Sequence, residues 1–193
     1  MHTPTQPASR APIRSGVEAH QALAAAADDL LSQTAAFLES LPADVISGPS
    51  ARIRGGTIGK HIRHTLDHYI AAISGLSGAV VDYDRRERGG DVESDVAAAV
   101  QAVCEVRAAI RAIEPAAYAH TVHVRVLVAG HGPEPVEAEF QSTFARELAF
   151  VTHHAVHHHA MIKCIAEEFG TRPGDDFGKA PSTVRHERAG AAG

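Results

Sequence analysis

The sequence predicts an all-α protein: a four-helix bundle with a small β-hairpin inserted before the last long helix. Three observations lead to this prediction. Alanine dominates the hydrophobic fraction, which is 45% of the 193 residues, and alanine has the highest helix propensity. Apolar residues recur three and four residues apart in four long stretches. One further stretch alternates apolar and polar residues on both sides of a turn rich in glycine and proline, as hairpins do.

The four predicted helices share this apolar spacing and end before glycine or proline. They cover residues 15 or 16–41, 57–76, 91 or 94–114, and 142 or 143–169. Thr57 is a plausible N-cap of the second helix, and Gly170 a plausible stop for the fourth. The hairpin is predicted from residues 121–128 and 136–140, with its turn at 130–135.

The remaining segments define the domain organisation. We expect residues 1–14 to be a disordered leader, residues 15–185 to form one domain, and residues 186–193 to be a frayed tail. Residues 42–56 and 82–90 are predicted loops, the second of them strongly charged. The segment from residue 171 onward is predicted to be irregular, with Phe177 and Val184 packing back on the helices.

Composition excludes several classes of protein. The formal net charge is −5 and no stretch is rich in lysine and arginine, which argues against a nucleic-acid partner. No apolar run has transmembrane length and no signal peptide is visible, so we expect no membrane partner and a cytoplasmic location. Cys104 and Cys164 lie in apolar helical patterns and are predicted to be small core residues rather than a disulfide.

The 14 histidines are the anomaly in the composition, and two clusters of them stand out. In the second predicted helix, His61, His64 and His68 fall within an arc of about 60°. In the last, His154 and His158 are four residues apart, so that both rings can face one ion. The sequence therefore predicts a metal site between two helices.

The other histidines of the last helix differ in direction. His157 lies on the edge of the stripe formed by His154 and His158, whereas His153 and His159 are rotated away from it, towards solvent or a neighbouring helix.

Neutral imidazole is a common metal ligand near neutral pH. We predict that His64, His154 and His158 are the ligands, and three protein ligands would leave an open position, as in catalytic sites. His68 and His157 are the candidate catalytic residues, placed beside the ligands to move a proton. Glu147, two turns before His154, is predicted to hydrogen-bond a ligand imidazole or a bound water.

Two segments, residues 57–64 with Asp67 and His68, and residues 150–158, resemble the DinB-like family of four-helix bundles. In that family one histidine of the second helix joins two histidines, four residues apart, on the last helix. These positions match His64, His154 and His158. The resemblance implies a zinc, nickel or iron ion and a homodimer, and some members are thiol-dependent transferases and isomerases. The chain departs from the family in its hairpin and in extra histidines, at positions 61, 68, 153, 157 and 159.

The leading functional hypothesis is a metal-dependent enzyme, either a thiol-dependent transferase or a hydrolase, in which the ion activates a thiol or a water. Its substrate would be a small molecule, with a low-molecular-weight thiol as a candidate, entering between the second and last helices. One alternative is a non-catalytic sensor or store, which a closed site including His61 would favour. The others are an interaction module with a structural ion and a packed, pH-responsive histidine core.

Overall fold

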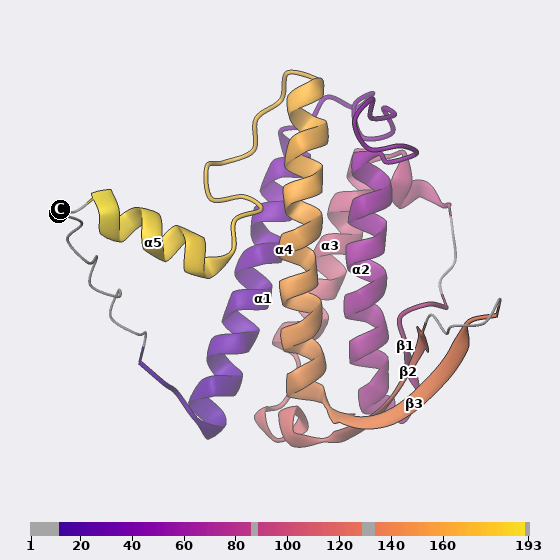
Figure 1. The fold of residues 1–193 in the computed structure, drawn as a ribbon, viewed down its shortest axis with the longest axis vertical. Coiled ribbons are helices and arrows are strands. Elements are labelled where there is room, and N and C mark those ends of the chain that lie inside the picture. Colours follow the sequence, from indigo (N-terminus) through magenta and orange to yellow (C-terminus); the bar gives the residue numbers. More distant parts are fainter. Residues whose placement is uncertain (1–11, 86–88, 129–133, 192–193) are drawn as a thin grey trace, which may run out of the picture.

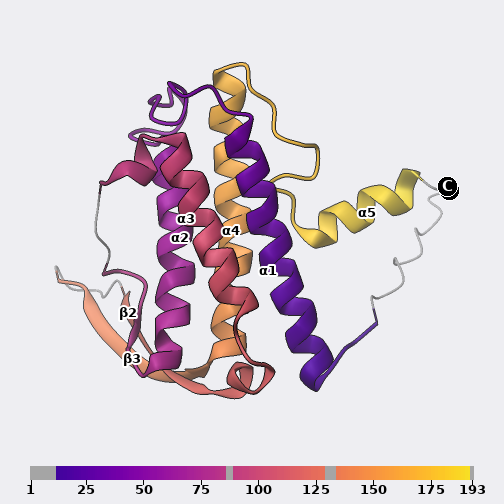
Figure 2. The same ribbon diagram turned by 180° about the vertical axis from the view of Figure 1, so that it is seen from behind.

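The computed structural model describes residues 12–85, 89–128 and 134–191. This part of the chain is mostly helical, with five α-helices and a small three-stranded sheet. Four long helices lie side by side: α1 (Gly16–Glu39), α2 (Ile58–Ser74), α3 (Val96–Arg111) and α4 (Phe144–Glu168). Helix α1 packs mainly on α3, and α2 packs mainly on α4 (Figures 1 and 2). The contact between α2 and α4 brings together the two helices that carry the histidine clusters.

The helices are held by a continuous apolar core. Its largest fully buried aliphatic side chains come from several helices and include Leu31, Leu38, Ile62, Leu148 and Ile162. Burial of each such side chain contributes about 1.5–3 kcal/mol. Three helices begin at a side-chain cap, and the Thr57 cap predicted from the sequence accepts a hydrogen bond from the Lys60 amide.

The predicted hairpin is present as β2 (Thr121–Val128) and β3 (Val136–Thr143), paired antiparallel from Thr121↔Thr143 to Val128↔Val136. Its predicted turn lies largely outside the described residues. Strand β3 leads directly into α4, and the sheet lies beside the lower ends of α2 and α4 in the view of Figure 1.

A third strand was not predicted. Strand β1 (Val81–Asp82) pairs parallel to β2, at the start of the segment expected to be a charged loop. Residues 86–88 of this segment lie outside the described part of the chain, and the short 3₁₀ helix η2 (Asp91–Glu93) follows directly after the segment. A two-residue strand is too short to show an alternating pattern.

The first turn of α2 is fixed by close backbone contacts. The Gly59 amide donates to the Ile46 carbonyl at 2.8 Å. A Cβ atom at Gly59 would lie 2.1 Å from the Glu93 carbonyl oxygen, so only glycine lets η2 approach α2 this closely. Glu93 also lines the pocket described below.

The C-terminal segment differs from its prediction. Residues Pro181–Ala191 form helix α5, which lies beside α1 and α4, so the expected irregular tail is wrong there and the boundary at residue 186 falls inside a helix. Phe177, in contrast, is buried as predicted, and Val184 is half-buried. The expected leader falls mostly outside the described residues, as does the last part of the expected frayed tail, residues 192–193.

Both cysteines are exposed, contrary to prediction. Each adjoins a buried residue, Val103 or Ile165, and a step of one residue rotates a helical side chain by about 100°, out of the core. No helix in the described ranges is long and apolar enough to cross a membrane.

Candidate metal centre

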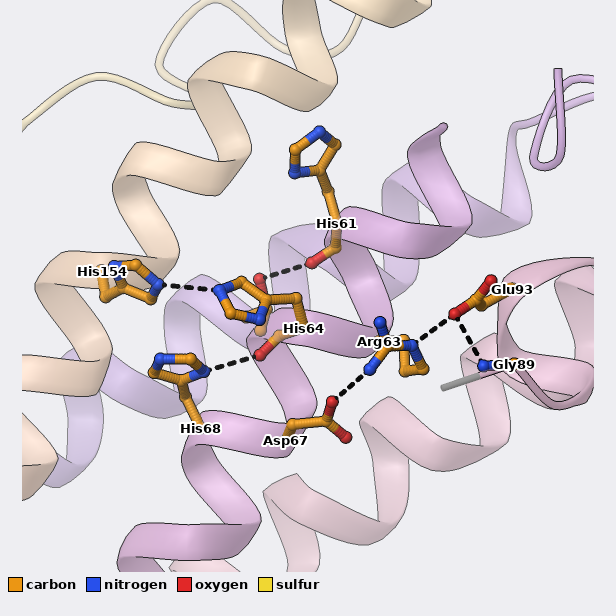
Figure 3. A network of polar contacts seen from close by, with 9 residues as sticks. His61, Arg63, His64, Asp67, His68, Gly89, Glu93 and His154 are labelled. Atoms are coloured by element: carbon orange, nitrogen blue, oxygen red, sulfur yellow. Dashed lines mark hydrogen bonds and ion pairs between the residues drawn. The ribbon is translucent and has the colours of Figure 1, made fainter. Parts of the chain in front are cut away.

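Three histidine side chains converge between α2 and α4. The Nε2 atom of His154 lies 3.2 Å from Nε2 of His64 and 2.9 Å from Nε2 of His158. One nitrogen from each of the three rings lies within 4.8 Å of the other two. Figure 3 shows the rings of His64 and His154 facing each other across the two helices. These are the three residues that the sequence predicted as ligands.

The spacing and type of these donors fit one divalent ion. Zinc–imidazole bonds of about 2.0–2.1 Å in a tetrahedral site would place the ligand nitrogens about 3.4 Å apart. The two Nε2–Nε2 distances from His154, 3.2 and 2.9 Å, are slightly shorter than this spacing. Imidazole nitrogen is a suitable ligand for zinc, nickel and iron alike.

His158 is buried and its pKa is strongly lowered. It is 7% exposed, and burial, together with the neighbouring imidazoles of His154, His64, His61 and His157, lowers its pKa to about 2. The ring is therefore neutral at pH 7. A neutral imidazole has a lone pair for a metal ion.

His61 contacts a candidate ligand instead of joining the three converging nitrogens. Its Nδ1 atom lies 2.9 Å from Nδ1 of His158, the ring nitrogen that does not face His154. Burial and the nearby His157 lower the pKa of His61. Metal-binding histidines usually hydrogen-bond through their second nitrogen, and His61 is placed to be that partner of His158.

The two candidate catalytic histidines occupy different surroundings. His68 is 5% exposed, and its Nδ1 donates to the His64 carbonyl at 2.9 Å, because a carbonyl oxygen can only accept. Its ring stacks against Tyr83, with centroids 5.0 Å apart, and against His154, at 4.4 Å. His157 is exposed, with its ring centroid 5.3 Å from that of His158. Only His157 therefore has open access to solvent.

Two aromatic side chains complete the surroundings of these histidines. Tyr83 stacks on His68. Phe150 stacks on His154, with centroids 5.8 Å apart and planes 16° apart, and its contact was not predicted. The signal was available, because Phe150 lies four residues before His154 and therefore on the same helical face.

Glu147 does not contact a ligand imidazole, which was one of the two roles predicted for it. Its fully buried carboxylate accepts hydrogen bonds from Tyr83 Oη at 2.7 Å, Ser142 Oγ at 2.6 Å and Arg146 Nη1 at 2.9 Å, rather than from a ligand imidazole. Burial and then the contact with Glu147 raise the pKa of the Tyr83 hydroxyl. Glu147 therefore acts on the site indirectly, by fixing the ring that stacks on His68.

The structure confirms that His153 and His159 point away from the centre. His153 is exposed. His159 is fully buried, with Nε2 2.8 Å from Thr34 Oγ1 and its ring stacked on Phe177 at 4.2 Å, and burial lowers its pKa to about 3. His159 thus connects α4 to α1 and to the segment before α5.

A pocket of about 460 Å³ opens beside the centre, at the N-terminal end of α2. Its lining includes the side chains of His61, His64 and His158. The turn at residues 53–56 and the η2 region form its other sides. A small molecule in this pocket would reach two of the three candidate ligands, in the region where substrate entry was predicted.

One wall of the pocket is braced by an ionic network. Arg63 donates to Asp67, which lies four residues further along α2, and also to Glu93 of η2. Glu93 in turn accepts a hydrogen bond from the Gly89 amide at 3.1 Å (Figure 3). The network joins α2 to η2.

Comparison with known proteins gives one partial similarity. Over 107 residues the chain is 33% identical to FK506-binding protein 5 of Rhizopus delemar, a match that covers 55% of this chain and 27% of that protein. The chain therefore corresponds to about a quarter of the length of this relative. No family model matches the chain, and no solved structure matches it. The function proposed below is therefore inferred from the geometry of the histidine site.

Proposed function

We propose that this protein is a metalloprotein of the DinB-like type, in which α1 to α4 form a four-helix bundle and His64, His154 and His158 bind one divalent ion. The observation that supports it most directly is the convergence of three imidazole nitrogens from α2 and α4. Zinc, nickel and iron are the candidate ions, because each binds imidazole.

The proposed activity is that of a metal-dependent enzyme acting on a small molecule, as a thiol-dependent transferase or a hydrolase. A divalent ion supplies Lewis-acid activation of a thiol or water nucleophile at neutral pH. His157, exposed beside His158, is the group we propose to exchange a proton with solvent. His68 is packed between Tyr83 and His154, so we propose that it acts mainly by positioning His154.

Two features favour an enzyme over a closed sensor or storage site. His61 contacts Nδ1 of His158 and is not in the group of converging nitrogens among the described residues, whereas the alternative of a closed site would include it. A pocket also adjoins the centre. The homodimer and the cytoplasmic location stay predictions.

Elemental analysis of the purified, untagged protein tests the metal site. We expect about one equivalent of zinc, nickel or iron in the native chain, and loss of that metal in the His64→Ala and His154→Ala variants. The matched control is His153→Ala, which removes an exposed imidazole from the same helix and should keep the metal. Absence of metal after reconstitution, or full retention in both ligand variants, would contradict the proposal.

The proposed transferase or hydrolase activity needs a second measurement. Metal-loaded protein is screened for thiol transfer and for hydrolysis, with His154→Ala and His153→Ala in parallel. Turnover that disappears only in His154→Ala supports an enzyme, whereas turnover that is equal in both variants would not come from this centre.

A further inference from the structure

The pocket beside the metal centre is rich in positive charge. Apart from its histidines, it is lined by three cationic side chains, Arg54, Lys60 and Arg63, and by one carboxylate, Glu93. This balance contrasts with the whole chain, which carries a formal net charge of −5. Positive charge is therefore concentrated around this pocket, in a chain whose net charge is negative.

The three cations are not equivalent. Arg63 is engaged by Glu93 and Asp67, so its charge is compensated within the pocket wall. Lys60 Nζ donates to the Gly55 carbonyl at 2.9 Å, which holds the ammonium at the pocket but leaves two of its three donors for a ligand. Arg54 lies in the adjoining turn, and its planar guanidinium matches a carboxylate or phosphate group.

The centre itself adds to this positive field when it is loaded. Three neutral imidazoles do not compensate the two charges of a divalent ion, so an anionic ligand would be favoured beside it. The pocket volume of about 460 Å³ suits a small molecule that extends from the turn at residues 53–56 to His64 and His158.

We infer that the substrate is a small molecule carrying an oxyanion, a carboxylate or a phosphate group, which Arg54 and Lys60 bind so that the rest of the molecule lies at His64 and His158. Recognition of the oxyanion follows from the pocket alone. Its role in orienting a substrate rests on the proposed metal-dependent function.

Calorimetric titration of the metal-loaded, full-length protein tests this inference. The probes are succinate, inorganic phosphate and succinamide, which resembles succinate in shape but lacks its charge. We expect succinate or phosphate to bind at least about ten-fold more tightly than succinamide, and the stronger of the two to identify the type of oxyanion. Added salt should weaken this binding.

Two double variants locate the binding site. Arg54→Ala with Lys60→Ala should weaken oxyanion binding about ten-fold or more, because both charge-assisted contacts are lost. Arg52→Ala with Lys163→Ala removes the same charge outside the pocket and should leave the affinity unchanged. Circular dichroism establishes that both variants fold.

Metal content is measured in the same samples, so the two proposals can fail separately. Oxyanion binding that is unchanged in the Arg54 and Lys60 variant would overturn the inference, as would succinamide binding as tightly as succinate, or the absence of any binding to metal-loaded protein. Protein that holds no metal but binds succinate through Arg54 and Lys60 would overturn the metal proposal and support the pocket.

Discussion

At the scale of single residues, His158 is fixed through both of its ring nitrogens. Nε2 lies 2.9 Å from His154, and Nδ1 lies 2.9 Å from His61. If Nε2 binds the proposed ion, Nδ1 would carry the proton and donate a hydrogen bond to His61, which would orient the ring and strengthen it as a ligand. In the proposed centre, His61 would therefore be a positioning residue rather than a ligand.

We expect His61→Ala to weaken metal affinity roughly ten-fold while leaving a full equivalent of metal at saturation, because loss of such a partner typically costs ten- to hundred-fold. Competition with a chromogenic chelator measures the affinity, and His153→Ala is the control. If His61→Ala instead abolished the site at saturating metal, His61 would have to be a ligand.

The sequence was enough to group the three candidate ligands, but not to find all of the contacts around them. The four-residue spacing of His154 and His158 puts both on one face of a helix, and the structure brings His64 to them. The contact of Glu147 with Tyr83 could not be foreseen, because the two residues are 64 positions apart and only tertiary packing joins them.

At the scale of elements, Asp28 connects α1 to α3. Its carboxylate accepts from Arg107 Nε at 3.0 Å and from Arg111 Nη2 at 2.7 Å. Burial by itself would raise the pKa of Asp28, but hydrogen bonds and charges from Arg111 and Arg107 outweigh burial and hold the pKa below its ordinary value of 3.8. Asp28 is thus more acidic in the folded than in the unfolded chain.

This shift makes the contribution of Asp28 depend on pH. Its stabilisation is fully present above pH 3.8, the ordinary value, and is lost as the pH falls through the lower pKa of the folded state. We expect Asp28→Asn to reduce the free energy of unfolding by about 1 kcal/mol at pH 7, since the pair is partly exposed. Urea denaturation at pH 7 and in acid measures the difference, which should vanish in acid.

The control is Asn substitution of the adjacent, exposed Asp29. A difference between Asp28→Asn and the native chain that persisted unchanged in acid would show that packing, not charge, is responsible.

The long helices and the hairpin were predictable because their apolar residues follow clear periods over eight or more residues. Helix α5 was missed because none of its residues is buried, so no apolar stripe marks it. The only local signal was Pro181 at its first position, where proline is favoured.

At the scale of the whole molecule, the apolar core extends well beyond the candidate centre. Fully buried residues such as Leu31, Leu38 and Ile110 come from α1 and α3, neither of which provides a candidate ligand. Metal binding should therefore add to the stability of a chain that folds without it.

We expect chelation with EDTA to lower the unfolding temperature while the helical circular-dichroism signal at 25 °C remains. The loss of stability follows mass action, about 2.7–4.1 kcal/mol for free metal at 100 to 1,000 times its dissociation constant. Thermal unfolding followed at 222 nm measures both quantities. Collapse of the helical signal on chelation would instead favour a structural ion.

The central claim is that one ion lies among His64, His154 and His158. An anomalous difference map from crystals of metal-loaded protein, recorded at the absorption edge of the bound metal, tests it most directly. We predict a single strong peak about 2.0–2.1 Å from a ring nitrogen of each of the three histidines. A peak elsewhere in the molecule, or no peak between α2 and α4 in metal-loaded crystals, would contradict the proposed binding of the ion by these three histidines.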